Sequence, residues 1–145
     1  MVGEPEGHRR LLEEVTALYG WIDARQKHDS SRAGRCRACG ACCHFAAYDH
    51  RLYVTVPELM YLADRLGTRT LRPMHDGRCP YQQGSICTVH AHRFAGCRIF
   101  TCDGDPDFQS RLSEEALRRL KVLSEEGGIP YRYRDLATAL AAFPP

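Results

Sequence analysis

The stretch "RAGRCRACGACCHFAAY", from Arg32 to Tyr48, gathers four cysteines within eight positions, and we expect the fold to form around it. The four are Cys36, Cys39, Cys42 and Cys43. Two residues between cysteines let a tight turn aim both sulfur atoms at one centre, as in metal knuckles and ferredoxin-type loops. The neighbours Cys42 and Cys43 normally point apart. They therefore serve two centres, or one of them is a redox-active or spare thiol.

A second group of four cysteines follows later in the chain. It consists of Cys79, Cys87, Cys97 and Cys102. Two sets of four cysteines match two metal centres with four thiolates each. They match equally well one metal centre and a second set of reactive cysteines. The spacing does not separate these arrangements, so all eight cysteines are candidate metal ligands.

Other roles for the cysteines depend on the compartment. The N-terminus lacks the apolar segment of a signal peptide, and no stretch is apolar for the roughly 18 residues of a membrane span. We therefore expect a cytoplasmic chain with reduced thiols, which disfavours disulfides. Buried inert cysteines and a purely structural zinc site are the alternatives, and the zinc site is the stronger. His44, His90 and His92 lie near the cysteines as further candidate ligands, although surface positions suit them better.

The charge balance disfavours nucleic acid as a partner. The formal net charge is +2 with neutral thiols, and eight thiolates around two metal centres would bring it to about −2. Such a protein has no general basic surface. Arginines beside the cysteines could offset the local negative charge, or could reflect the preference for Arg over Lys in this chain. These are Arg35, Arg37, Arg78, Arg93 and Arg98.

The pattern of apolar residues predicts helices on both sides of the cysteines. Helical spacing predicts an N-terminal helix over about 8–28 and C-terminal helices over about 107–143, around a metal-binding core at about 36–102. Before the second cysteine group, "TVPELMYLADRLG" predicts a helix capped by Thr55 and Glu58 and ended by Gly67. Its predicted apolar face is Leu59, Leu62, Ala63 and Leu66. We expect one domain over 1–145, mainly α, wrapped around an irregular cysteine-rich metal-binding centre.

Both cysteine groups together resemble the CxxCxxCC (YkgJ-type) family, whose members are described as zinc- or iron-chelating domains. The resemblance covers about Cys36 to Cys102, and all eight cysteines fall on the pattern, including Cys79-Pro80 and Cys97-Arg98. One departure is Arg93-Phe94, where relatives usually have Arg-Pro. The resemblance implies metal binding, and kinship with flagellin lysine N-methylases, which share the cysteine pattern in longer chains.

We expect a protein that uses its thiolates to hold an iron–sulfur cluster, in electron transfer or redox sensing, with a protein redox partner or protein substrate. The alternatives are a zinc-binding structural or interaction module, and a metal-dependent enzyme that modifies proteins. An iron–sulfur oxidoreductase is an open expectation, and the sequence assigns no catalytic residue. The chain lacks a dinucleotide-binding loop, a phosphate loop and the three-cysteine motif of radical S-adenosylmethionine enzymes.

Overall fold

The structure is a computed structural model that describes residues 5–34, 52–75, 77–84, 86–101 and 103–144. The first cysteine group, His44 and Cys102 lie outside the described residues, as do Arg35 and Arg37. Cys79, Cys87 and Cys97 lie within them.

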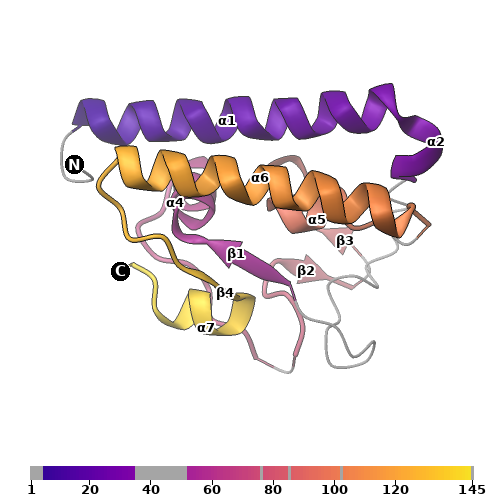
Figure 1. The fold of residues 1–145 in the computed structure, drawn as a ribbon. Helices are drawn as coiled ribbons and strands as arrows, with labels where there is room; N and C mark the ends of the chain where they lie inside the picture. Colours follow the sequence, from indigo (N-terminus) through magenta and orange to yellow (C-terminus); the bar gives the residue numbers. More distant parts are fainter. Residues whose placement is uncertain (1–4, 35–51, 76, 85, 102, 145) are drawn as a thin grey trace.

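Two long helices form one layer of the molecule. Helix α1 (Pro5–His28) and helix α6 (Pro106–Glu126) lie side by side and run in opposite directions (Figure 1). The predicted N-terminal helix is confirmed, and its apolar stripe is buried at Leu11, Val15, Leu18, Tyr19 and Ile22. Asp105 caps α6 by accepting a hydrogen bond from the amide of Phe108, and Pro106 occupies the first turn, where its missing N–H costs nothing.

Helix α4 (Val56–Leu66) confirms the predicted helix before the second cysteine group. Thr55 is its N-cap, and the Glu58 carboxylate accepts a hydrogen bond from the Thr55 amide at 3.1 Å. Gly67 ends the helix with a φ of 66°, which glycine adopts without steric cost. The prediction was wrong for Leu66, which is 39% exposed because the last turn of the helix extends beyond the core.

Short strands and helices complete the fold. Strand β1 (Tyr53–Thr55) pairs in antiparallel fashion with β4 (Tyr133–Asp135), and helix α7 (Leu136–Ala141) follows β4. Strands β2 (Gln82–Gln83) and β3 (Ile86–Cys87) form a small hairpin. The remaining elements are α2 (Ser30–Ala33), the 3₁₀ turn η2 (His90–His92) and α5 (Ala95–Ile99). The mainly α prediction is confirmed, since the described strands have at most three residues each.

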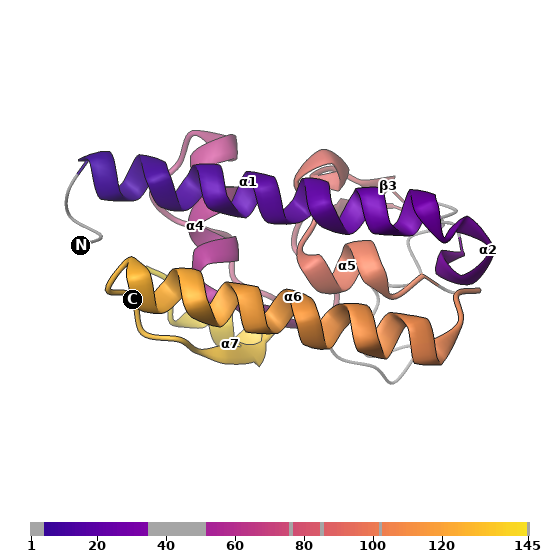
Figure 2. The same ribbon diagram turned by 45° about the horizontal axis from the view of Figure 1, so that its top comes forward.

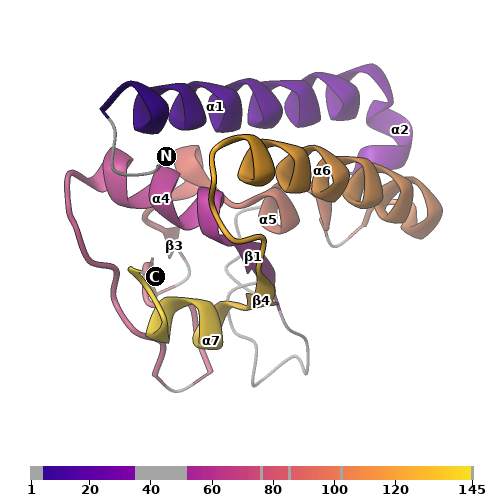
Figure 3. The same cartoon turned by 60° about the vertical axis from the view of Figure 1, so that its left-hand side comes forward.

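The apolar interior consists of two clusters on either side of α4 and α5. The first lies beneath α1 and α6, and seen from above α5 lies between and below these two helices (Figure 2). The second lies among α4, β1, α7 and the stretch that carries the second cysteine group, on the side of the molecule away from α1 (Figure 3). Within the described residues, no helix combines the length and apolar character that crossing a membrane requires.

Candidate metal centre

Cys79 and Cys87 are placed by the β2–β3 hairpin. The Cys79 carbonyl accepts a hydrogen bond from the amide of Gln82 at 3.1 Å, which closes a turn directly before β2. Gln82 is also the residue opposite Cys87 in the hairpin. The hairpin therefore brings two cysteines that are separated in sequence to the same end of one small element.

Cys97 is placed by the short helix α5. It lies in the middle of that helix, which packs against α1, α6 and β1. Cys97 and Cys87 are both partly buried and pack against the second apolar cluster, in which Cys79 is a buried member. The structure thus gathers the three described cysteines of the second group around one cluster.

The three described cysteines do not by themselves form a metal site. No disulfide joins Cys79, Cys87 and Cys97 to one another. Within the described ranges, no three His, Cys, Asp or Glu side chains are close enough together to hold a metal ion. A complete centre therefore needs ligands from the part of the chain that the structure leaves undescribed.

Gly34, the last described residue before the first cysteine group, lies against residues on both sides of position 102. A Cβ atom on Gly34 would lie 2.5 Å from Asp103 Oδ1, 2.6 Å from Thr101 Oγ1 and 2.7 Å from the Gly104 nitrogen. The Thr101 hydroxyl donates a hydrogen bond to the Ala33 carbonyl at 2.7 Å. In sequence, Cys36 follows Gly34 by two positions and Cys102 follows Thr101 by one, so the described residues next to the two groups lie together here.

The residue that follows the segment 35–51 also rests on the second group. Leu52 Cδ1 would lie 2.6 Å from a Cβ atom on Gly96, the residue before Cys97. The Leu52 carbonyl is held in turn by the Leu136 amide at 2.8 Å, next to the β1–β4 ladder. Both ends of the segment that carries the first cysteine group are therefore anchored on the stretch that carries the second.

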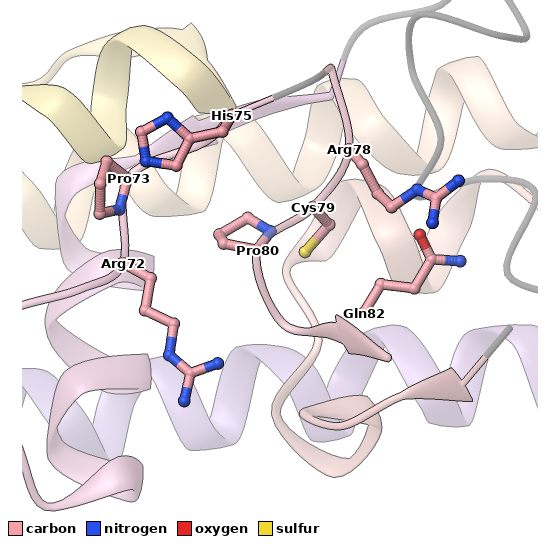
Figure 4. A pocket seen from close by; sticks show the side chains of 7 residues that line it. All are labelled: Arg72, Pro73, His75, Arg78, Cys79, Pro80 and Gln82. Atoms are coloured by element: carbon pink, nitrogen blue, oxygen red, sulfur yellow. The ribbon is translucent and has the colours of Figure 1, made fainter. Parts of the chain in front are cut away.

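A hollow of about 660 Å³ opens beside Cys79 (Figure 4). Arg72, His75 and Arg78 line it together with Pro80 and Gln82, so its wall carries basic side chains. The Arg72 guanidinium lies 5.5 Å from the centre of the Tyr81 ring, and the Arg72 amide donates to the Tyr81 hydroxyl at 2.9 Å. The volume is many times the roughly 30 Å³ that one water molecule occupies in the liquid.

Arg98, next to Cys97, binds several neighbours rather than facing solvent. Its Nε donates to the Arg93 carbonyl at 2.8 Å, its Nη2 to the Ala91 carbonyl at 3.1 Å, and its Nη1 to Asp23 of α1 at 2.9 Å. The guanidinium also lies 4.2 Å from the centre of the Tyr19 ring. The sequence placed Arg98 beside a cysteine but gave no sign of this structural role.

Glu58 is a buried carboxylate that the sequence analysis assigned to helix capping alone. Its side chain also accepts hydrogen bonds from the Tyr19 hydroxyl and from the amide of Ala95, the first residue of α5. Burial raises the pKa of Glu58, while the hydrogen bonds from Ala95, Thr55 and Tyr19 act in the opposite direction. Burial also raises the pKa of Tyr19 well above its usual value, and the charges of Glu58 and Cys97 add to that rise.

Two of the described histidines, His90 and His92, lie on the η2 turn. His90 is exposed, and desolvation, followed by the charges of Arg93 and Arg98, lowers its pKa. The ring of His92 makes an edge-on contact with Tyr61 of α4, at 6.1 Å between centroids. His92 therefore packs against the helix, and its role as a ligand stays a prediction, as does that of His44.

The hairpin, α5 and the contacts at Gly34 and Leu52 define a small helical protein in which the described cysteines, Cys79, Cys87 and Cys97, lie around one apolar cluster. The chain belongs to the CxxCxxCC family, described as a "putative zinc- or iron-chelating domain", whose model matches residues 35–118. The matched part includes every cysteine and excludes α1. Neither the curated proteins nor the solved structures contain a match to this chain.

Proposed function

We propose that the eight cysteines hold an iron–sulfur centre with a role in electron transfer or redox sensing. The ligands in this proposal are Cys36, Cys39, Cys42, Cys43, Cys79, Cys87, Cys97 and Cys102. Membership of a zinc- or iron-chelating family supports metal binding, and the identity of the metal and its role are our proposal. The observation that carries it is the anchoring of Gly34 and Leu52 against residues beside Cys102 and Cys97.

The burial of Cys79 suits an iron–sulfur cluster. Cys79 is only 8% exposed and lies among apolar side chains, and burial of this kind helps to set the potential of an iron–sulfur cluster. A zinc-binding structural or interaction module is the second candidate, because four thiolates also satisfy zinc completely.

The first test is to measure iron, zinc and acid-labile sulfide in protein purified without oxygen, together with its visible absorption. Iron and sulfide in near-stoichiometric amounts, with thiolate-to-iron charge-transfer bands that bleach on reduction, are expected for the cluster. Zinc without sulfide or colour would reject the redox role and support the structural module. Protein that takes up neither metal would reject the proposal as a whole.

Replacement of single cysteines tests the proposed ligands. Cys79→Ser and Cys97→Ser are expected to lower the metal bound per chain at least several-fold after exposure to a chelator, because each removes a thiolate ligand. Met74→Leu is the matched control, since Met74 also brings a sulfur atom to the second apolar cluster. Equal retention of metal in the cysteine variants and in Met74→Leu would remove Cys79 and Cys97 from the ligand set.

A further inference from the structure

We propose that Glu58 is a positioning residue for the metal centre, because it holds the helix that carries Cys97 against α1 and α4. The inference rests on the proposed function, since it takes Cys97 to be a metal ligand. It also assigns a role to α1, which lies outside the residues that match the family model.

Both carboxylate oxygens of Glu58 accept hydrogen bonds, and they come from three parts of the chain. Oε2 accepts from the amide and the hydroxyl of Thr55, at 3.1 and 3.0 Å. Oε1 accepts from the Tyr19 hydroxyl at 3.1 Å and from the Ala95 amide at 2.6 Å. Helix capping would use Oε2 alone, so Oε1 serves to join α1 and α5 to α4.

Because the Glu58 carboxylate is buried, loss of its hydrogen bonds is expected to be strongly unfavourable. Glu58 is only 1% exposed, and a buried charge is tolerated when hydrogen bonds replace its hydration. The Ala95 amide is one of the first N–H groups of α5, which have no partner within the helix itself. Glu58 therefore fixes the beginning of the helix two residues before Cys97.

Arg98 fixes the same helix on the other side of Cys97. Its side chain, 6% exposed, reaches Asp23 of α1, and its own carbonyl accepts a hydrogen bond from Gln26 of α1 at 2.5 Å. The guanidinium also packs on the ring of Tyr19, whose hydroxyl binds Glu58. Cys97 thus lies between two points that are tied to α1, so its backbone has little freedom to shift.

Such restraint matters because a ligand must be held within about 0.5 Å of its bonding position. Groups that orient metal ligands typically change affinity by about 10- to 100-fold when they are removed. Loss of the hydrogen bonds to Glu58 should therefore lower the affinity for the metal even when the chain remains folded. The Cys97 sulfur would contribute less to the coordination of the metal.

The test compares Glu58→Gln with Tyr19→Phe in the full chain, loaded with Co²⁺ as a probe under reducing, oxygen-free conditions. Glu58→Gln keeps the side-chain shape but places an NH₂ group among donors, while Tyr19→Phe removes one donor and keeps the ring beneath Arg98. We expect about tenfold faster loss of Co²⁺ to a chelator in Glu58→Gln and a smaller change in Tyr19→Phe. The thiolate-to-cobalt absorption should weaken in the same order.

Ser124→Ala is the matched control, because Ser124 is fully buried and donates its hydroxyl to Leu120 within α6. It tests whether loss of any buried hydrogen bond changes the metal site. The inference is overturned if Glu58→Gln and Tyr19→Phe release Co²⁺ at the same rate as Ser124→Ala and give the same spectra. If Glu58→Gln does not fold, Tyr19→Phe decides, and an unchanged cobalt spectrum in that variant would overturn it. A wild-type chain that binds neither Co²⁺ nor iron would instead overturn the proposed function itself. If it binds iron alone, the release of iron is compared in the same variants.

Discussion

Arg98→Ala is expected to lower the free energy of unfolding by about 3 kcal/mol. The guanidinium makes hydrogen bonds to the carbonyls of Ala91 and Arg93 and to the Asp23 carboxylate, and the residue is 7% exposed. Removing it leaves the two carbonyls without this donor and a gap beneath Tyr19. Asp23 adds little to the cost, because its half-exposed side chain regains water. Denaturant unfolding at a fixed metal content measures the effect.

Arg118→Ala is the control for the loss of an arginine. Its ion pair with Glu115 is long, at 3.9 Å, and its side chain is 70% exposed, so we expect a change of at most about 0.5 kcal/mol. Arg98→Lys should recover only part of the stability, because an ammonium group cannot reproduce the planar fork of donors. Similar unfolding midpoints for Arg98→Ala and Arg118→Ala would show that the contacts of Arg98 contribute little.

Gly34→Ala is expected to be the other strongly destabilising change, by about 3 kcal/mol or more. Gly34 has a φ of 73° and a ψ of −170°, a backbone region that is essentially restricted to glycine. An added Cβ would also come within 2.7 Å of the Gly104 backbone nitrogen. The contact between 33–34 and 101–104 must then open, so we expect metal content to fall together with stability.

Gly20→Ala is a control with the opposite expected sign. Gly20 lies within α1, and a Cβ there would meet nothing within 4 Å, so alanine should stabilise the helix by about 0.5–1 kcal/mol. Thermal unfolding of both variants and metal analysis of the purified proteins measure the two effects. A Gly34→Ala protein with wild-type stability and metal content would contradict the proposal that the anchoring of Gly34 supports the metal centre.

The helices could be predicted from sequence because their signals are local. Apolar spacing identified α1 and α6, and Thr55, Glu58 and Gly67 marked the ends of α4. The pairing of β1 with β4 could not be predicted, since each has three residues and they lie far apart in the chain. A pair of strands that short carries too weak a pattern to identify its partner.

The residue types of the candidate site could be predicted from the sequence, but the contacts that hold these residues in place could not. The cysteine spacing indicated metal, and membership of the chelating family agrees with it. The second role of Glu58 depends on Ala95, 37 positions away, so no local pattern reveals it. The only sign of this role in the sequence is that Glu58 is a carboxylate among the apolar residues of the helix VPELMYLADRL. The complete set of eight ligands stays a prediction, because five of the cysteines lie outside the described residues.

The anchored ends at Gly34 and Leu52 also bear on the thermodynamics of loading. Bringing together the two ends of an unfolded chain segment as long as residues 35–51 costs on the order of 2–3 kcal/mol in chain entropy. In this fold, the contacts of Gly34 with Asp103 and Gly104 and of Leu52 with Leu136 hold the two flanking residues in place. Folding therefore contributes to that entropic cost, and more of the free energy of metal–thiolate bonding is left for affinity.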